Sequence, residues 1–156
     1  MFGHKYSLEH ICSFNHRLQM PPETIGRVAD GLRVTIYITG GDFTGPRLRG
    51  KVRPVGGDWG VMRPDGVFVI DVRSTFETQD GALLYVTYSG LIDAGRDGYE
   101  RLQRGEIATD GTPFRTTPRF QTGHPAYEWA NRIVCVGMGE LHMSVPEVRY
   151  DVYAIN

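Results

Sequence analysis

A carboxylate and an indole follow two consecutive glycines in the segment Gly56-Gly57-Asp58-Trp59. Glycine lets the backbone turn tightly, and Trp59 would cap the end of a barrel if the sheet closes. An apolar barrel mouth would raise the pKa of Asp58 and make this carboxylate suited to general-base chemistry. The alternative is an Asx-type turn, in which the carboxylate accepts hydrogen bonds from backbone N–H groups. The sequence leaves both interpretations open.

Asp71 and Arg73 share one face of the segment 67–78, whose other face is apolar. If the charged face lines the inside of a barrel, the planar guanidinium of Arg73 would bind a carboxylate or phenolate, with Asp71 beside it. An unpaired buried ion is costly, so such charges need partners. The alternative is a structural Asp–Arg pair on a solvent or subunit face.

Two further side chains have types that suit acid or oxyanion chemistry. Arg115 lies in an extended segment broken by prolines, where it would hold substrate charge or stabilise an oxyanion, or else form a salt bridge. Arg119 has the same parity, and spacing does not choose between the two. Tyr85 and Tyr88 lie on opposite strand faces, so at most one faces the interior. We assign that place to Tyr85, which follows a hairpin, as a proton donor or else a packing tyrosine.

Aromatic, amide and imidazole side chains complete the candidate ligand contacts. Tyr127, Trp129 and Asn131 would close one end of the structure, with Asn131 orienting a ligand, or form a plain hydrophobic plug. His10 and His16 fall on the buried parity of the first strand, and His10 is taken as a substrate-binding candidate. Six residues of strand separate the two imidazoles by about 20 Å, too far to share a metal ion. The other histidines show no ligand spacing, so no metal site is expected.

These side chains must be positioned by strands, because the chain alternates with a period of two. Turn signals recur about every dozen residues: Pro21-Pro22 and Gly40-Gly41 are expected to end strands, and Arg63-Pro64-Asp65-Gly66 to form a hairpin. The expected extended segments are 6–20, 32–39, 43–52, 59–62, 67–78, 82–89, 112–121, 133–139 and 148–155. One short helix is expected over 99–105, ended by Gly105. This pattern predicts an all-β antiparallel barrel or sandwich, and a barrel of about eight strands can hold one small ligand.

Composition limits the possible partners and location. The 156 residues fit a single domain spanning 1–156, and 17 basic against 18 acidic residues give no field for holding nucleic acid or an anionic membrane. No apolar run approaches the roughly 20 residues of a membrane helix, and charged residues within the first fourteen break any signal-peptide core. We therefore expect a cytoplasmic protein, in which Cys12 and Cys135 are buried, reduced thiols.

Several motifs together resemble one family. They are Ile38-Thr39-Gly40-Gly41-Asp42-Phe43, Gly45-Pro46-Arg47-Leu48-Arg49-Gly50-Lys51-Val52, Gly56-Gly57-Asp58-Trp59, Arg63-Pro64-Asp65-Gly66, Asp71-Val72-Arg73, Asp80-Gly81-Ala82, Phe114-Arg115-Thr116-Thr117-Pro118-Arg119-Phe120 and Tyr127-Glu128-Trp129-Ala130-Asn131-Arg132. Their order and spacing resemble uncharacterised protein family 0311, also called domain of unknown function 3237. The resemblance implies a calycin-like (lipocalin-like) barrel that often forms homo-oligomers. It implies no particular activity. Ala130 stands where the family often carries Leu.

The sequence has no P-loop, no dinucleotide fingerprint and no Gly-x-Ser-x-Gly elbow, so no cofactor is expected. The leading hypothesis is a cofactor-independent lyase, isomerase or cyclase that acts on a small apolar, aromatic or polyketide-like substrate. In it Asp58 removes a proton, Arg73 or Arg115 stabilises the anion, and Tyr85 returns a proton. The alternatives are a non-catalytic small-molecule binder and a structural homo-oligomer with a filled barrel.

Overall fold

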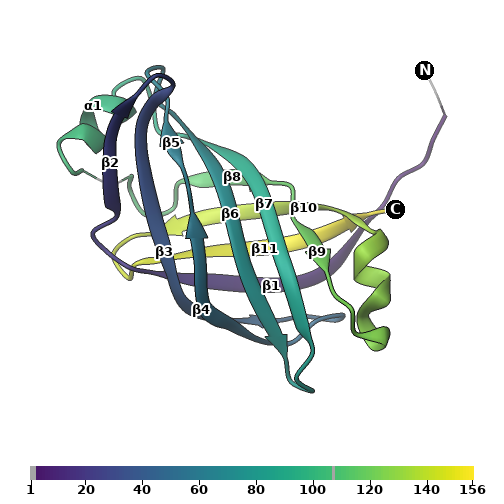
Figure 1. Cartoon of the computed structure of the whole chain (residues 1–156). Helices are drawn as coiled ribbons and strands as arrows, with labels where there is room; N and C mark the ends of the chain where they lie inside the picture. The colour runs from purple at the N-terminus through teal and green to yellow at the C-terminus, as the bar shows by residue number, and fades with distance from the viewer. Residues whose placement is uncertain (1–2, 107) are drawn as a thin grey trace.

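Eleven strands form one continuous antiparallel sheet in the computed structural model, which describes residues 3–106 and 108–156 (Figure 1). Met1 and Phe2, part of the stretch expected to lack a signal-peptide core, lie outside the described residues. The strands are β1 (Leu8–Leu18), β2 (Glu23–Val28), β3 (Gly31–Thr44), β4 (Gly50–Asp58), β5 (Val61–Met62), β6 (Val67–Thr78), β7 (Leu83–Asp93), β8 (Pro113–Thr116), β9 (Arg119–Gln121), β10 (Val134–His142) and β11 (Glu147–Ile155). The helix α1 covers Gly98–Gln103, and η1 (Pro125–Arg132) is a 3₁₀-helix.

The sheet closes on itself. Strand pairing runs β1–β3–β4–β6–β7–β8–β10–β11 and returns from β11 to β1, every pair being antiparallel. The remaining strands extend this ring, as β2 pairs with β3, β5 with β3 and β6, and β9 with β7. The prediction of an all-β antiparallel barrel with one short α-helix is confirmed for the described residues. None of the helices in that part of the chain is long and apolar enough to span a bilayer.

A bulge in β1 reverses the expected exposure of the first residues. Pairing with β11 shifts register between His10 and Cys12, and Ile11 and Cys12 are both buried. The parity therefore changes at the bulge: Leu8 and His10 lie on the outer surface, while Phe14 and His16 face inward. The prediction that His10 lies on the buried face is wrong because one extra residue re-aims every side chain before it.

Gly40-Gly41 does not end a strand as predicted. Strand β3 continues to Thr44 through both glycines, whose φ angles are +136° and +156°. A Cβ on Gly41 would lie 1.9 Å from the carbonyl oxygen of Asn15, so the glycine permits close approach of β1 instead of a chain break. The expected strand over 43–52 is accordingly divided between the end of β3, a loop and the start of β4.

Aromatic rings fill the half of the barrel near η1. Phe76 is fully buried and packs on Phe43 (ring centres 4.7 Å apart), Phe14 (5.1 Å) and Phe120 (6.4 Å). Figure 1 shows α1 and η1 at opposite ends of the barrel, and α1 contacts β5. The half beneath α1 is packed less completely and contains the cavity described next.

Candidate functional site

An apolar cavity of about 110 Å³ occupies the α1 half of the barrel. Its wall is built from inward-facing side chains of the strands, including Val34, Ile36, Ile38, Met62, Phe68, Ile70, Val72, Phe114 and Val148. Four polar side chains reach it from inside the barrel: His16, Asp58, Tyr88 and Tyr150. Residues of α1 and the segment after it, among them Arg101, Leu102 and Glu106, complete the lining. The interior is therefore neither solid nor fully apolar, and its polar groups are few and convergent, as in ligand sites.

Asp58 enters the cavity because it ends β4 on the inner face. It pairs with Ile36 on β3 and Val72 on β6, and both of these side chains also line the cavity. Its Oδ1 accepts a hydrogen bond from the backbone N–H of Asp71 (2.9 Å). Because Asp71 lies on β6, this bond joins two strands and does not form an Asx-type turn. Burial raises the pKa of Asp58 to about 7, with a further increase from the charge of Asp71, although the Asp71 N–H opposes it. The carboxyl group therefore titrates in the neutral range, as a general base requires.

Three buried side chains from three strands form a hydrogen-bonded row beside the cavity. The Tyr88 hydroxyl on β7 lies 3.0 Å from His16 Nδ1 on β1 and 2.9 Å from the Tyr150 hydroxyl on β11. Burial lowers the pKa of His16 to about 3, so this imidazole is neutral at physiological pH. Burial also raises the pKa of both tyrosines, and the negative charge of Asp58 raises each further, so both phenols keep their protons. Phe14 stacks on Tyr150 with ring centres 4.4 Å apart and holds its ring in place.

The predicted acid Tyr85 is on the wrong face. Its side chain is 44% exposed on the outside of β7, whereas Tyr88 lies inside at 4%. The prediction that Tyr85 and not Tyr88 faces the interior is wrong, because a position after a hairpin does not determine which strand face is inward. The alternation of Leu84, Val86 and Tyr88 with polar residues is the usable signal, since these three share the buried face.

The predicted anion-binding arginines also lie outside the barrel. Arg73 pairs with Asp71 at 3.0 Å, and both side chains are about half exposed. Phe68, Ile70 and Val72 occupy the inner face of β6, so the charged face must point outward. The structural Asp–Arg pair, which the sequence left open, is the arrangement observed.

Arg115 is likewise exposed, because its neighbours Phe114 and Thr116 point into the barrel. Its guanidinium donates to the carbonyl of Phe114 at 2.8 Å and does not line the cavity. Trp59 is 37% exposed, with the Arg73 guanidinium 5.3 Å from its ring centre, and it covers the outer wall instead of the cavity.

The residues predicted to close the barrel do lie at an end of it, but at the end away from the cavity. In η1, Tyr127 donates to Asp80 (2.9 Å), and the Trp129 ring lies under Arg47 (3.9 Å). Asn131 accepts from the Thr122 N–H and donates to the Thr122 carbonyl. These contacts brace η1 against the barrel. None of the three lines the cavity in the structure, and neither does His10, whose ring packs against Tyr153.

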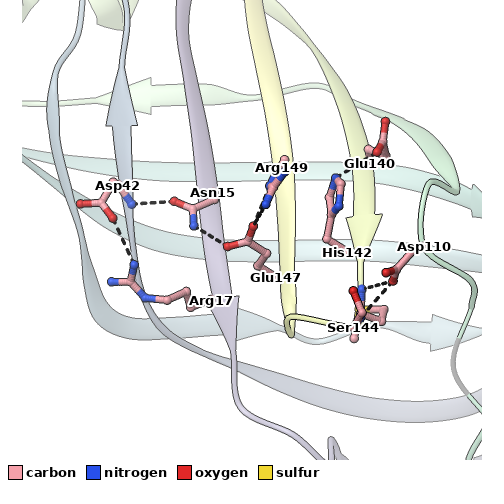
Figure 2. A network of polar contacts seen from close by, with 10 residues as sticks. Asn15, Arg17, Asp42, Asp110, Glu140, His142, Ser144, Glu147 and Arg149 are labelled. Atoms are coloured by element: carbon pink, nitrogen blue, oxygen red, sulfur yellow. Dashed lines mark hydrogen bonds and ion pairs between the residues drawn. The ribbon is translucent and has the colours of Figure 1, made fainter.

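A polar network links β1, β3 and β11 (Figure 2). Asn15 donates to Glu147 (2.8 Å) and accepts from the backbone N–H of Asp42 (2.8 Å). Arg149 binds the same Glu147 carboxylate through two nitrogens. Burial raises the pKa of Glu147, but the hydrogen bonds from Asn15 and Arg149 outweigh it and leave the pKa below the usual value. These side chains are hydrogen-bonded or ion-paired to one another. The network therefore links strands, and we assign it no role in ligand binding or catalysis.

Two other sequence predictions concern thiols and metals. Cys12 and Cys135 are buried and free, as predicted, and burial raises their pKa values to about 12 and about 11. Thiols of this kind are poor nucleophiles. Within residues 3–106 and 108–156, no three His, Cys, Asp or Glu side chains are grouped as metal ligands would be.

The fold and the cavity define a class: a closed antiparallel barrel with an apolar interior site that the Asp58 carboxyl group enters from the sheet. The family model described as a protein of unknown function (DUF3237) matches residues 6–155. The chain belongs to this family, as the sequence motifs predicted. A UPF0311 protein of Rhodopseudomonas palustris is 36% identical over 118 residues, 75% of this chain and 77% of the relative. One of Bradyrhizobium diazoefficiens is 37% identical over 120 residues, 76% and 78% of the two chains.

Solved structures are similar over nearly the whole length. A beta-barrel like protein of Acinetobacter baumannii has a TM-score of 0.84 and 32% identity, covering 98% of both chains. A conserved protein of unknown function of Rhodopseudomonas palustris has a TM-score of 0.85 and 31% identity, covering 98% of this chain and 99% of the other. An enzyme from Penicillium herquei, with a TM-score of 0.69 and 20% identity over 100% and 98% of the chains, shares the fold.

Proposed function

We propose that this protein is an enzyme that moves protons on a small apolar substrate held in the barrel, as a cofactor-independent lyase, isomerase or cyclase. The observation that carries the proposal is the Asp58 carboxyl group, which faces an apolar cavity with its pKa raised to about 7. A carboxylate poised near neutral pH is a stronger base than an ordinary aspartate and still loses its own proton at that pH.

The chemistry that fits is proton abstraction next to a carbonyl group. Among the described residues, Asp58 has one hydrogen bond, to Oδ1, so Oδ2 is available to take a proton from the substrate carbon. The electron pair of the broken C–H bond moves to the carbonyl oxygen and forms an enolate. A tyrosine hydroxyl of the interior row donates a hydrogen bond to that oxygen. Return of the proton to a carbon completes an isomerisation, and loss of a leaving group completes an elimination.

The cavity volume limits the substrate. A cavity of about 150 Å³ holds benzene, so a cavity of about 110 Å³ favours a ligand no larger than benzene. An aromatic ring or a cyclic ketone fits this description. A larger polyketide-like substrate would require the segment of α1 that lines the cavity to move outward. We therefore use small cyclic ketones to test the site.

The test is exchange of ketone protons for deuterium. Cyclopentanone is incubated in D₂O with the purified protein, and deuterium incorporation at the carbons beside the carbonyl is followed by NMR. Catalysed exchange is expected with the natural protein, and Asp58→Asn should reduce it by at least about 100-fold, as loss of a general base does. Asp42→Asn is the matched control, because it removes an exposed carboxylate that pairs with Arg17 and should leave the exchange unchanged. Equal exchange by Asp58→Asn and the natural protein would rule out the base.

A non-catalytic binder of small apolar molecules is the second candidate, favoured by the almost entirely apolar lining of the cavity. It predicts saturable binding of cyclopentanone without any catalysed exchange. A structural protein with a filled barrel does not match the hollow interior.

A further inference from the structure

We infer that His16 fixes the direction of the interior hydrogen bonds so that the Tyr150 hydroxyl donates into the cavity, and that the site selects apolar ligands bearing an acceptor oxygen. This rests on the proposed function in one respect, that the cavity is where the ligand binds. His16 is then a positioning residue, and Tyr150 is the group that touches the ligand.

The row has two possible directions when Tyr88 donates one of its two hydrogen bonds and accepts the other. Each phenol has one proton, and a neutral imidazole has one N–H. In the first direction His16 Nδ1–H donates to Tyr88, Tyr88 donates to Tyr150, and the Tyr150 proton is left for a ligand. In the second direction Tyr150 donates to Tyr88 and Tyr88 donates to His16 Nδ1. The proton of His16 is then on Nε2, and Tyr150 can only accept from a ligand. The two directions therefore select opposite ligand chemistry.

The surroundings of His16 Nε2 decide between the two directions. This nitrogen is buried and has no hydrogen-bond partner among the residues that the structure describes. The first direction leaves a bare lone pair there, whereas the second leaves an N–H donor without an acceptor. The Tyr88 hydroxyl is placed to donate to Tyr150 at 2.9 Å, which belongs to the first direction. Among backbone groups a buried N–H without a partner is rarer than an under-bonded carbonyl oxygen, and the first direction follows the same order. The first direction is therefore favoured, and His16 carries its proton on Nδ1, 3.0 Å from the Tyr88 hydroxyl.

The geometry at the other end of the row agrees with this direction. Tyr150 lines the cavity, and its hydroxyl accepts from Tyr88 at 2.9 Å. No described residue accepts its proton. Successive hydrogen bonds polarise one another, so a donor at the end of such a row is stronger than an isolated phenol. With the Asp58 carboxyl in the same cavity, the ligand that satisfies both groups has an acceptor oxygen beside an acidic C–H or O–H bond, as a ketone, enol or phenol does.

The first test observes the tautomer directly. Nitrogen-15 NMR of histidine-labelled protein distinguishes Nδ1–H from Nε2–H imidazole, and the His16→Asn variant identifies the signals of His16. The Nδ1–H form is expected from pH 5 to 9, without titration. An Nε2–H form would overturn the inference, because Tyr150 would then be an acceptor. This result does not depend on any turnover, so it is independent of the deuterium-exchange test.

The second test measures what Tyr150 recognises. Cyclopentanone and methylenecyclopentane have the same shape, but only the ketone has an acceptor oxygen. Tyr150→Phe should weaken cyclopentanone binding by about 2- to 10-fold, as loss of one neutral hydrogen bond does, and leave methylenecyclopentane binding unchanged. Equal effects on both probes would show that Tyr150 only packs. Either result stands whether or not the protein catalyses exchange.

Variants at the far end of the row separate positioning from packing. His16→Asn keeps an N–H donor near the Nδ1 position, whereas His16→Leu removes it, and Tyr88→Phe removes the intervening hydroxyl without changing the ring. Selectivity for the ketone should survive in His16→Asn and fall in His16→Leu and Tyr88→Phe. Tyr88→Phe keeps the packing, so it remains informative if His16→Leu fails to fold. If Tyr88→Phe kept the full preference for the ketone, the hydrogen-bonded row would not orient Tyr150, and the inference would be refuted.

Discussion

The raised pKa of Asp58 predicts that this side chain destabilises the folded protein at neutral and alkaline pH. Its burial beside an apolar cavity disfavours the ionised form, and the charge of Asp71 on the adjacent strand acts in the same direction. Arg101 and Glu106 are the charged groups that line the cavity from α1 and the segment after it. His16, Tyr88 and Tyr150 face the same cavity but stay neutral. Replacing Asp58 with Asn keeps an acceptor for the Asp71 N–H and removes the charge.

The magnitude follows from the pKa of this carboxyl group in the unfolded and folded states. An aspartate in an unfolded chain has a pKa of 3.8, and folding raises the pKa of Asp58 to about 7. Between these values the folded state holds a proton that the unfolded state has lost, so stability falls as pH rises through this window. Three pKa units at roughly 1.4 kcal/mol each give about 4 kcal/mol of destabilisation above pH 7. Asp58→Asn should therefore be more stable than the natural protein at pH 8.5 by about that amount, with the gain disappearing toward pH 4.

The assay is urea unfolding of both proteins across pH 4 to 8.5. All other titrating groups are common to the two proteins, so the difference in unfolding free energy isolates Asp58. A difference that stays constant with pH would refute the reasoning, since it would mean that Asp58 ionises as an ordinary exposed carboxyl. Asp42→Asn provides the comparison, because its exposed carboxylate pairs with Arg17 on the surface.

Three other perturbations probe the rest of the barrel. Folding lowers the pKa of His16 to about 3, so His16 disfavours the folded state as pH falls below 6.5, opposite in sign to Asp58 over the same range. Relative to His16→Asn, the natural protein should therefore be less stable at pH 4 than at pH 7 in urea unfolding. Phe76→Ala, in the filled half of the barrel, should cost about 3–5 kcal/mol in urea unfolding at pH 7, and a loss below about 1 kcal/mol would show that the aromatic cluster collapses without penalty. Gly41→Ala places a Cβ 1.9 Å from the Asn15 carbonyl oxygen at φ +156°, so its thermal midpoint should fall by several degrees, while Gly81→Ala, at φ +85° with nothing near the new Cβ, should fall less.

Local patterns predict the barrel well where strands alternate and turns carry glycine and proline. The segment 67–78 coincides with β6, and the turn at Arg63–Gly66 joins β5 to β6, where Gly66 takes φ +84°. The pattern fails where a bulge changes parity, as at Ile11, because period two assumes one residue per pleat. It also fails for β2, whose residues are exposed or only partly buried and so show no apolar alternation.

The site is predicted less completely because it depends on which groups meet across the barrel. The glycine-rich context of Asp58 marks it as a candidate, and the structure places it in the cavity. Tyr88 and Tyr150 are 62 residues apart in sequence and meet only because β7 and β11 face each other across the closed sheet. His16 is recognisable as a buried polar residue, but one strand gives no indication of its partner. Long-range pairing of this kind leaves no signal in local spacing.

The barrel has a cavity that reduces its stability at one end and tight aromatic packing that increases its stability at the other. A hollow interior and a half-buried ionisable carboxyl both reduce stability, and both lie beneath α1. The half near η1 carries the compensating packing, where Phe76 contacts the rings of Phe14, Phe43 and Phe120, and Tyr127 and Trp129 hold η1 in place. Because the closed sheet links the two halves through continuous strands, packing at one end keeps Asp58 and the tyrosines fixed at the other. Loss of packing at Phe76 should therefore disturb the cavity even though Phe76 does not line it, because its ring contacts that of His16, which does, with centres 5.9 Å apart.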